Sequence, residues 1–234
     1  MNDDDRAIAQ CYASPPCLMH EVDPAYMGLF QAADPKQWSD VRRWRKTERE
    51  RLIKSRLAIS SDIRCRQADQ IAASLEQAIS EVERSVVSAY WPFRGEPDLR
   101  GFIKRLAARG ARTALPVVIA RGQPLIFRNW APGDPLRRGV WNIPVPADDA
   151  ELVLPDVVIA PMVGFDLGCY RLGYGGGYFD RTLAAMSRRP FVIGVGYAQA
   201  TLPTIHPQPH DIRMDMLVTE ESVIRLSSRP IRPQ

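Results

Sequence analysis

The sequence predicts an α/β protein, a three-layer sandwich in which a mostly parallel central sheet carries helices on both faces. Short apolar segments alternate with segments of helical periodicity along most of the chain, which is the order of βαβ units. The segments 152–165 and 190–198 are apolar enough for buried strands, as in sheets covered on both faces. With 234 residues, 45% of them hydrophobic and 25% charged, the chain can bury a sizeable core and has an ordinary globular composition.

The first part of the chain divides into an extension and two helices. Residues 1–37 show no sustained periodicity, and we interpret them as an N-terminal extension. A helical pattern begins at Trp38 and runs to about Ile59, and a second helix with one apolar face follows to about Glu83. The candidate N-caps are Ser39 or Asp40 for the first helix and Ser61 or Asp62 for the second.

Residues 38–226 are expected to form one α/β domain, followed by a basic tail at 227–234. Within the domain, residues 131–149 are expected to be a proline-rich connection. Ligands of such sheets bind beyond the carboxyl ends of the strands, so we expect the functional site there. The expected strands lie in 85–93, 111–119, 124–130, 152–165, 190–198 and 215–226, and the expected helices in 99–110 and 176–189.

Charge is distributed unevenly along the chain, whose formal net charge is +4. Between Arg42 and Arg66, ten basic residues stand against three acidic ones, whereas the first forty residues hold seven acidic residues. This asymmetry indicates either an anionic partner for the basic helix or pairing of the two segments. A nucleic-acid-binding module built on this helix is therefore one alternative function, and strong salt dependence would mark it.

The sequence favours a cytoplasmic protein without a membrane partner. Its longest apolar run, residues 156–165, is broken by proline and glycine and is shorter than the roughly 20 residues a membrane helix needs. The first ten residues are acidic where a secretion signal would be basic, and four scattered cysteines predict free thiols. The extension has candidate metal ligands, but their spacing fits no common zinc pattern, and packing against the domain is the simpler interpretation. These candidates are Cys11, Cys17 and His20, with Glu21 or Asp23.

The most informative stretch is YRLGYGGGYFDR, residues 170–181, which combines four glycines with three tyrosines, two arginines and an aspartate. It lies between an expected strand and an expected helix, where glycines let backbone amides approach an anion and the helix dipole adds positive charge. This arrangement indicates a polyphosphate site, in which Arg171 and Arg181 can donate hydrogen bonds and Asp180 can hold magnesium. The stretch matches no general phosphate or dinucleotide fingerprint, so a glycine-rich turn without a ligand stays an alternative on these grounds.

The same stretch resembles the signature of the 5-formyltetrahydrofolate cyclo-ligases, also called methenyltetrahydrofolate synthetases. Further segments stand in the order and at the spacing of that family, from about Arg45 to Glu220: RTALPVV, FRNWAPGDPL, WNIPVP, APMVGFD and PHDIRMDMLVTE. The resemblance implies an ATP-dependent, C–N bond-forming ligase that uses Mg²⁺ and does not act on nucleic acid. Its substrate would be 5-formyltetrahydrofolate, with or without a polyglutamate tail. The product would be 5,10-methenyltetrahydrofolate, formed after phosphorylation of the formyl oxygen and with release of ADP and phosphate.

The resemblance also assigns residues to ATP and magnesium. Asp180 matches a magnesium carboxylate, and Asp215 is similar to a second acidic residue near the metal. Arg171, Tyr178 and Asp180 are the expected catalytic residues. The ATP-phosphate element matches Arg171, Leu172, Gly173, Tyr174, Gly175, Gly176, Gly177 and Tyr178.

The family directs a lysine and an arginine, four residues apart on the first helix, at ATP. Arg45 and Arg49 stand at these positions, one helical turn apart and therefore on one face. Arg45 departs from the family because it replaces a compact ammonium with a planar guanidinium, while Lys46 lies next to it. A merely solvated basic face is the alternative for this helix.

The segment YWPFRGEPD, residues 90–98, resembles the folate-side loop of the family. It makes Glu96 the expected partner of the pterin, because a carboxylate can accept two N–H bonds from an amino-pyrimidine edge. Phe93 offers stacking surface, and Trp141 resembles a tryptophan that walls the folate pocket. Tyr90 is expected in the core of the sheet.

One departure lies within the signature, where Cys169 stands at a usual glycine position and the glycine is displaced to Gly168. If the backbone needs a positive φ there, the cysteine costs about 1 kcal/mol or more. Its thiol would lie near the phosphate site as a structural bystander. Together with Arg45 and the extension, this departure motivates an alternative function, a non-catalytic nucleotide-binding relative without folate activity. The enzyme is favoured by four retained residues: Glu96, Trp141, Asp180 and Asp215.

Overall fold

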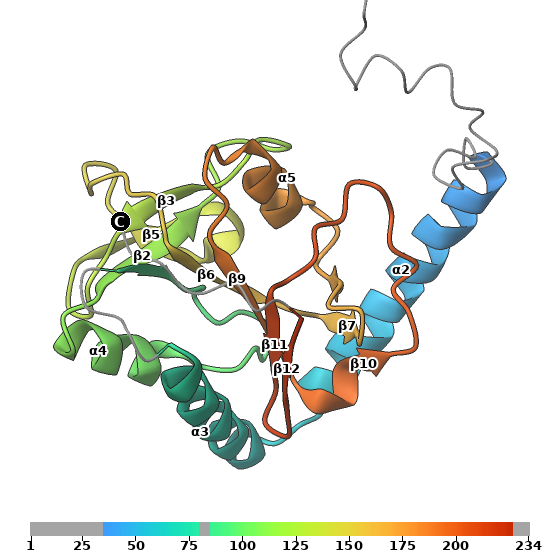
Figure 1. Cartoon of the computed structure of the whole chain (residues 1–234), viewed down its shortest axis with the longest axis horizontal. Helices are drawn as coiled ribbons and strands as arrows, with labels where there is room; N and C mark the ends of the chain where they lie inside the picture. Colours follow the sequence, from blue (N-terminus) through green and yellow to red (C-terminus); the bar gives the residue numbers. More distant parts are fainter. Residues whose placement is uncertain (1–34, 80–84, 227–234) are drawn as a thin grey trace, which may run out of the picture. The chain divides into compact units, whose positions relative to one another are not determined.

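The computed structural model describes residues 35–79 and 85–226 (Figure 1). The candidate metal ligands of the extension and the basic tail therefore lie outside the described residues. The chain divides into two compact units, Met1–Arg43 and Trp44–Gln234. Helix α2, Pro35–Leu57, begins in the first unit and ends in the second.

Helix α2 begins at Pro35 rather than at Trp38, so it starts earlier than predicted. Proline fits this position because the first N–H of a helix has no partner in any case and the fixed φ suits the helix. Ser39 lies inside the helix, where its hydroxyl donates to the carbonyl of Lys36. The prediction that Ser39 or Asp40 caps the helix is therefore wrong.

Helix α3, Ser61–Ala78, is capped one residue earlier than predicted. Its N-cap is Ser60, whose side-chain oxygen accepts a hydrogen bond from the backbone N–H of Ile63. The predicted caps Ser61 and Asp62 fall in the first turn instead, where the Asp62 carboxylate suits the positive end of the helix dipole. The buried face has the predicted helical spacing: Ala68, Ile71, Ala72 and Leu75.

A seven-stranded sheet forms the middle layer and confirms the predicted α/β sandwich. Its strand order is β12-β11-β9-β6-β1-β2-β3. The inner strands from β11 to β2 are parallel to their neighbours, and antiparallel strands β12 and β3 form the two edges. The bounds are β1 Val86–Ser88, β2 Arg112–Val117, β3 Ile126–Asn129, β6 Val157–Pro161, β9 Phe191–Val195, β11 Met216–Val218 and β12 Val223–Arg225.

Helices cover both faces of this sheet (Figure 1). Helices α3 and α4, Arg100–Ala108, pack on one face, and α5, Tyr178–Ala185, packs on the other with the part of α2 that belongs to the second unit. Each face has its own hydrophobic core. In β6, Val157 and Ile159 point into the first core and Val158, between them, into the second, as the period of two in a strand requires.

The predicted proline-rich connection at 131–149 contains a hairpin that the sequence did not indicate. Strand β4, Leu136–Arg138, pairs with β5, Pro144–Pro146, around the 3-10 turn η2, Val140–Asn142. Strands of three residues are too short for their alternation to be told from a turn.

The last predicted strand, 215–226, is likewise two strands, the β11–β12 hairpin. The turn between them is closed by Thr219, whose hydroxyl accepts from the backbone N–H of Ser222 at 3.0 Å. A small separate sheet has the order β10-β7-β8 and leads into the glycine-rich loop. Its strands are β7 Gly164–Asp166, β8 Arg171–Leu172 and β10 Thr201–Leu202, with the 3-10 turn η3 at Ala198–Ala200.

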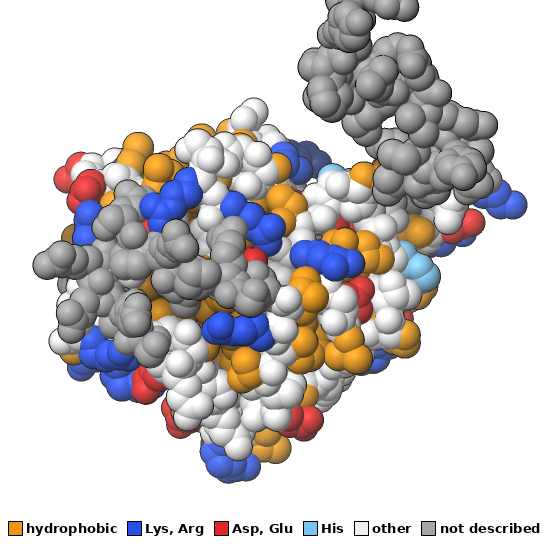
Figure 2. All heavy atoms as spheres, viewed as in Figure 1, with side chains coloured by type: hydrophobic (Ala, Val, Ile, Leu, Met, Phe, Trp, Pro, Cys, Tyr) orange, Lys and Arg blue, Asp and Glu red, His pale blue; other side chains and the backbone are white. Residues whose placement is uncertain are grey.

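No helix in residues 35–79 and 85–226 is both long and apolar enough to cross a membrane. Figure 2 shows Lys and Arg side chains in separate patches on the face drawn there, among hydrophobic and polar groups. The large apolar side chains that are exposed lie in different segments of the chain, for example Leu57, Ile119 and Leu167.

Candidate functional site

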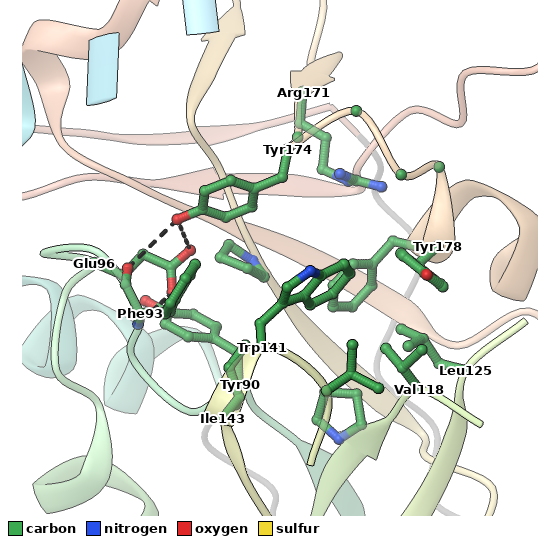
Figure 3. A pocket seen from close by; sticks show the side chains of 18 of the residues that line it. Tyr90, Phe93, Glu96, Val118, Leu125, Trp141, Ile143, Arg171, Tyr174 and Tyr178 are labelled. Carbon is green, nitrogen blue, oxygen red and sulfur yellow. Dashed lines mark hydrogen bonds between the residues drawn. The ribbon is translucent and has the colours of Figure 1, made fainter. Parts of the chain in front are cut away.

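A cavity of about 440 Å³ opens at the carboxyl end of the parallel strands, where the sequence predicts the site. Pro161, the last residue of β6, lines it together with the end of β2. The segment after β1, the β4–β5 hairpin, the glycine-rich loop and α2 supply most of the remaining lining. Figure 3 shows Glu96, Trp141, Tyr174 and Tyr178 around this space. The cavity therefore joins segments that are far apart in sequence.

The glycine-rich loop turns from β8 into α5 with a backbone path that requires glycine. Gly175 has a φ of +93°, and Gly177, the N-cap of α5, has a φ of +64°. A Cβ atom at Gly176 would lie 2.6 Å from the ring of Tyr178. The loop lies in the cavity lining, as expected for a phosphate-binding element.

Arg171 and Asp180 form a partly buried ion pair beside this loop. The Nη2 atom of Arg171 donates to Oδ2 of Asp180 at 3.0 Å, and the backbone N–H of Ile212 donates to Oδ1 of the same carboxylate at 3.2 Å. The guanidinium also lies 5.1 Å from the ring centroid of Phe179. Its Nε is buried and has no hydrogen-bond partner among the described residues. The ion pair with Asp180 therefore leaves this N–H group buried without an acceptor in the described residues.

Arg45 lines the cavity, but its guanidinium holds a neighbouring loop. Its Nε donates to the carbonyl of Ile205 at 3.0 Å, and Nη2 donates to that of His206 at 2.9 Å. The two terminal nitrogens also pair with the two carboxylate oxygens of Asp211. A lysine ammonium could not make this two-point contact.

Arg49 contacts the glycine-rich loop directly. Its Nε donates to the carbonyl of Gly173 at 2.7 Å, and a Cβ atom at Gly175 would lie 3.3 Å from its Cζ. Burial, and secondly the charge of Arg45, lower the pKa of Arg49, while Asp211 opposes them. The positive charges of Arg45 and Arg49 are thus only partly balanced by Asp211, which favours an anion next to the loop.

Glu96 stands across the cavity from Tyr178 (Figure 3). Its Oε2 accepts from the backbone N–H of Phe93 at 2.8 Å, and its Oε1 accepts from the hydroxyl of Tyr174 at 2.9 Å. Burial raises the pKa of Glu96 to about 7, against the opposing effects of Arg56 and of these two hydrogen bonds. The carboxylate is thus desolvated and placed to gain from further N–H donors.

Aromatic rings complete the walls, partly as the sequence predicts. Trp141 lies on η2 with a φ of +56°, followed by Asn142 at +61°, and its ring is edge-on to Tyr178 at 5.7 Å. Such backbone strain in residues other than glycine is typical of functional sites. Phe93 lies 5.9 Å from the ring of Tyr174. Tyr90, expected in the core, does belong to it and also lines the cavity, with its hydroxyl donating to the carbonyl of Pro97.

Asp215 lies outside the cavity lining. It precedes β11 and so stands at the amino end of the sheet, whereas the cavity lies at the carboxyl end. Its carboxylate accepts from the backbone N–H of Val192 at 2.9 Å and lies 3.4 Å from Nη2 of Arg189. The structure therefore does not bring Asp215 to Asp180. No group of three or more His, Cys, Asp or Glu residues in 35–79 and 85–226 forms a metal cluster.

Cys169 has a φ of +62°, the positive value that favours the usual glycine of the family. Its side chain is buried in the hydrophobic core on the α5 face and does not line the cavity. Burial, with a further effect of Asp166, raises the pKa of the thiol. The expectation that the thiol lies near the phosphate site is therefore corrected, and its place in the core fits a structural residue.

Sequence reasoning missed two charged residues that hold parts of the site, Arg56 and Asp211. A signal for Arg56 existed, because it follows Arg45 and Arg49 at i+11 and i+7, which places the three on one face of a helix. No comparable signal marks Asp211, since its partner Arg45 is far away in sequence.

The comparisons with known proteins decide the family. A model of the 5-formyltetrahydrofolate cyclo-ligase family matches residues 41–220. The chain belongs to that family. It is 30% identical over 175 residues to the 5-formyltetrahydrofolate cyclo-ligase of Mycolicibacterium smegmatis, covering 72% of this chain and 89% of the relative. It is 30% identical over 137 residues to the cyclo-ligase of Haemophilus influenzae, covering 55% of this chain and 73% of the relative.

A solved structure shows the same fold. The NMR structure of 5,10-methenyltetrahydrofolate synthetase from Aquifex aeolicus superimposes with a TM-score of 0.68 at 27% identity, covering 80% of this chain and 96% of the other. Membership in this family of ATP-dependent ligases confirms the predicted family, enzyme class and folate-directed activity at the level of the family.

Proposed function

We propose that the protein converts 5-formyltetrahydrofolate to 5,10-methenyltetrahydrofolate with consumption of ATP. One observation carries the proposal: the glycine-rich loop and Glu96 line a single cavity, so a polyphosphate and a pterin have one space in which to meet. Its volume of about 440 Å³ is that of a small-molecule site.

The reaction combines a phosphoryl transfer with a ring closure. The formyl oxygen attacks the γ-phosphorus and ADP leaves; N10 then attacks the formyl carbon, loses its proton, and phosphate leaves with the former formyl oxygen. An amide-type oxygen is a poor leaving group until it carries the phosphoryl group. The task of the protein is then to position the two substrates and to stabilise charge.

On the nucleotide side, we assign Arg171 to the phosphates. Its buried Nε has no acceptor among the described residues, while Asp180 fixes the other side of the guanidinium. The guanidinium lines the cavity beside the glycine-rich loop, so its charge would attract a phosphate bound there. Arg49 adds positive charge against the loop, and Tyr178 begins the helix that follows it. Arg45 acts by holding Asp211 and the loop around it.

Magnesium, when bound, would neutralise charge on the phosphates. Asp180 is the carboxylate that would hold it, because it lines the cavity at the glycine-rich loop and is fixed by Arg171 and Ile212. One carboxylate suffices, since Mg²⁺ in nucleotide sites takes most of its ligands from phosphate and water. Asp215 has no part in this assignment because of its place at the amino end of the sheet.

On the folate side, we assign Glu96 to the amino-pyrimidine edge of the pterin. Each of its oxygens already accepts one hydrogen bond and has a second lone pair for a ligand N–H. Phe93 and Trp141 provide ring surfaces beside it.

The glutamate tail of the folate has a separate place in this proposal. A second cavity of about 520 Å³ shares Val118 and Val140 with the first. Guanidinium groups are suited to the carboxylates of one or several γ-linked glutamates. Those that line this second cavity are Arg128, Arg137 and Arg138.

A cytoplasmic location stays a prediction from the sequence.

The test is the absorbance of the methenyl product when purified protein meets 5-formyltetrahydrofolate, ATP and Mg²⁺. We expect a rise that depends on ATP and on protein. A flat trace from protein that binds ATP would favour the alternative, a nucleotide-binding relative without folate activity.

A further inference from the structure

Three segments meet at one tyrosine hydroxyl group beside Glu96. Tyr174, from the glycine-rich loop, donates through its hydroxyl to Oε1 of Glu96 at 2.9 Å. The same hydroxyl accepts from Nη2 of Arg56 on α2 at 2.5 Å. The dashed lines of Figure 3 show that Tyr174 reaches toward Glu96 and away from the rest of its loop. A residue of the phosphate element is thus bonded to the carboxylate on the folate side.

The direction of these hydrogen bonds is fixed by chemistry. A guanidinium can only donate, so the Tyr174 oxygen accepts from Arg56 and its own hydrogen is free for an acceptor. Glu96 provides that acceptor at 2.9 Å, while the carbonyl of Phe93 lies farther away, at 3.4 Å. The order Arg56, Tyr174, Glu96 therefore runs from cation to carboxylate and is strengthened at both ends by charge.

Arg56 is itself held rigidly. Only 4% of the residue is exposed, and it does not line the main cavity. Its Nε donates to the carbonyl of Arg94 at 3.0 Å and its Nη1 to the carbonyl of Met162 at 3.3 Å. Its Cζ lies 5.7 Å from the ring centroid of Tyr174. The side chain is therefore a fixed anchor under the folate loop and the end of β6.

We propose that Arg56 is a positioning residue which, through the Tyr174 hydroxyl, holds Glu96 and the glycine-rich loop in one arrangement, so that folate and nucleotide each favour binding of the other. The inference rests on the proposed function. Its physical basis is that a pterin bound at Glu96 fixes the carboxylate, the carboxylate fixes Tyr174, and Tyr174 fixes the loop on which the nucleotide binds. The reverse order of events gives the same coupling free energy.

The positioning role of Arg56 should be visible in the pH dependence of folate binding, which a purely structural role would not change. The groups that face Glu96 are Arg56 from α2, Tyr174 from the glycine-rich loop, Tyr90 from the end of β1 and Tyr197 after β9. Burial raises the pKa of Glu96, and Arg56 and Tyr174 both lower it. Folate binding that requires the carboxylate should weaken below the pKa of Glu96. Loss of either partner raises the pKa of Glu96, so the pH below which folate affinity falls should move to a higher value.

The experiment compares Tyr174→Phe and Arg56→Met with wild type and with Tyr170→Phe. Tyr174→Phe keeps the ring and its packing while removing the hydroxyl, and it tests the inference even where Arg56→Met fails to fold. Tyr170 stands at the start of the same stretch but lies outside the cavity lining, so its variant is the matched control. The measurement is equilibrium binding of 5-formyltetrahydrofolate between pH 6 and 9, with and without a non-hydrolysable ATP analogue.

For Tyr174→Phe we expect folate affinity to fall about tenfold at pH 8, as for loss of a hydrogen bond to a charged group. The pH below which folate affinity falls should rise. The gain in folate affinity caused by the ATP analogue should disappear. The inference alone would be overturned if the wild type forms the methenyl product and Tyr174→Phe keeps three wild-type properties. These are the folate affinity, its pH dependence and its increase with the ATP analogue. A wild type that neither binds folate nor forms product would overturn the proposed function and the inference with it.

Discussion

The two walls of the cavity are built in opposite ways. The nucleotide wall is mostly one continuous stretch, residues 171–180, with Arg49 of α2 bonded to it. The folate wall joins distant segments, with Glu96 after β1 and Tyr174 on the glycine-rich loop, and Arg56 of α2 holds Tyr174 from outside the cavity. The first wall holds an N–H without an acceptor in the described chain, and the second holds a carboxylate whose pKa burial raises to about 7.

This difference teaches which changes should affect which ligand. Groups on the nucleotide wall act on phosphate and on the phosphoryl transfer, whereas Glu96 acts on the pterin. Variants of the two walls should therefore separate the two ligands, except at Tyr174, which belongs to both.

The largest effect is expected for Asp180→Ala. The variant loses the proposed magnesium carboxylate and the partner of Arg171, so we expect turnover to fall by about 10²–10³-fold, as for other losses of charge stabilisation at a transition state. Steady-state kinetics measures the loss, and circular dichroism should show a folded protein. Asp180→Asn is the matched variant of similar shape, and it should lose activity to a similar extent. Turnover within tenfold of wild type in both variants would contradict the assignment.

Glu96→Gln should weaken folate binding by about 10–100-fold, because a hydrogen-bonded charge is lost from the folate wall. ATP affinity should stay within about threefold of wild type. Equilibrium titrations with each ligand separate the two effects. Equal loss of both ligands would show that Glu96 supports the whole cavity instead of the pterin alone.

The same substitution should change stability in a pH-dependent way. The folded-state pKa of Glu96, about 7, lies above its ordinary value of 4.5, so the folded chain binds more protons than the unfolded chain between these values. The free energy of unfolding of wild type therefore falls as pH rises through this window, and the loss is complete above about pH 7. Glu96→Gln removes this loss and should gain about 1–3 kcal/mol at pH 8 but little at pH 5. Urea unfolding at both pH values measures it, and an equal gain at pH 5 would contradict the raised pKa.

A smaller effect is expected for Gly175→Ala on the nucleotide wall. The φ of +93° strains any other residue, and the new Cβ would lie 3.3 Å from Cζ of Arg49. We expect ATP affinity to fall about tenfold, with folate affinity changed far less, since about 1 kcal/mol or more of strain is introduced into the loop. Gly122→Ala is the control, because Gly122 also has a positive φ but no atom within 4 Å of the added Cβ. It should lose stability without losing ATP affinity.

The smallest effect concerns the second cavity. Replacement of Arg137 and Arg138 by Gln should raise the KM for a folate triglutamate about three- to tenfold, as for the loss of exposed ion pairs, and leave the monoglutamate nearly unchanged. Arg121→Gln removes a charge outside both cavities and should change neither. Equal effects on both substrates would place the tail elsewhere.

Much of the fold could be predicted because its signals are local. The buried strand at 157–161 and the amphipathic face of α3 are visible as apolar patterns over one element. The β4–β5 hairpin could not be predicted, since three-residue strands rich in proline and arginine carry no such pattern. The cap of α3 was misplaced by one residue because three consecutive residues, Ser60, Ser61 and Asp62, are all of types favoured at an N-cap.

The candidate site shows the same division. The glycine-rich loop was predictable residue by residue because its function lies in consecutive backbone. Arg45 shows the limit: its position on the helix was clear, but its partner Asp211 is fixed only by the fold. Asp215 shows the same limit. It comes directly before β11 and therefore lies at the amino end of the sheet, away from the cavity.

The central claim is that both ligands occupy one cavity, on different walls. The most direct test is equilibrium titration of the wild-type protein, Gly175→Ala and Glu96→Gln with 5-formyltetrahydrofolate and with a non-hydrolysable ATP analogue, each alone and both together. We expect one site per chain for each ligand, simultaneous binding in wild type, loss of nucleotide affinity in Gly175→Ala and loss of folate affinity in Glu96→Gln. Mutually exclusive binding, or equal loss of both ligands in both variants, would contradict the account.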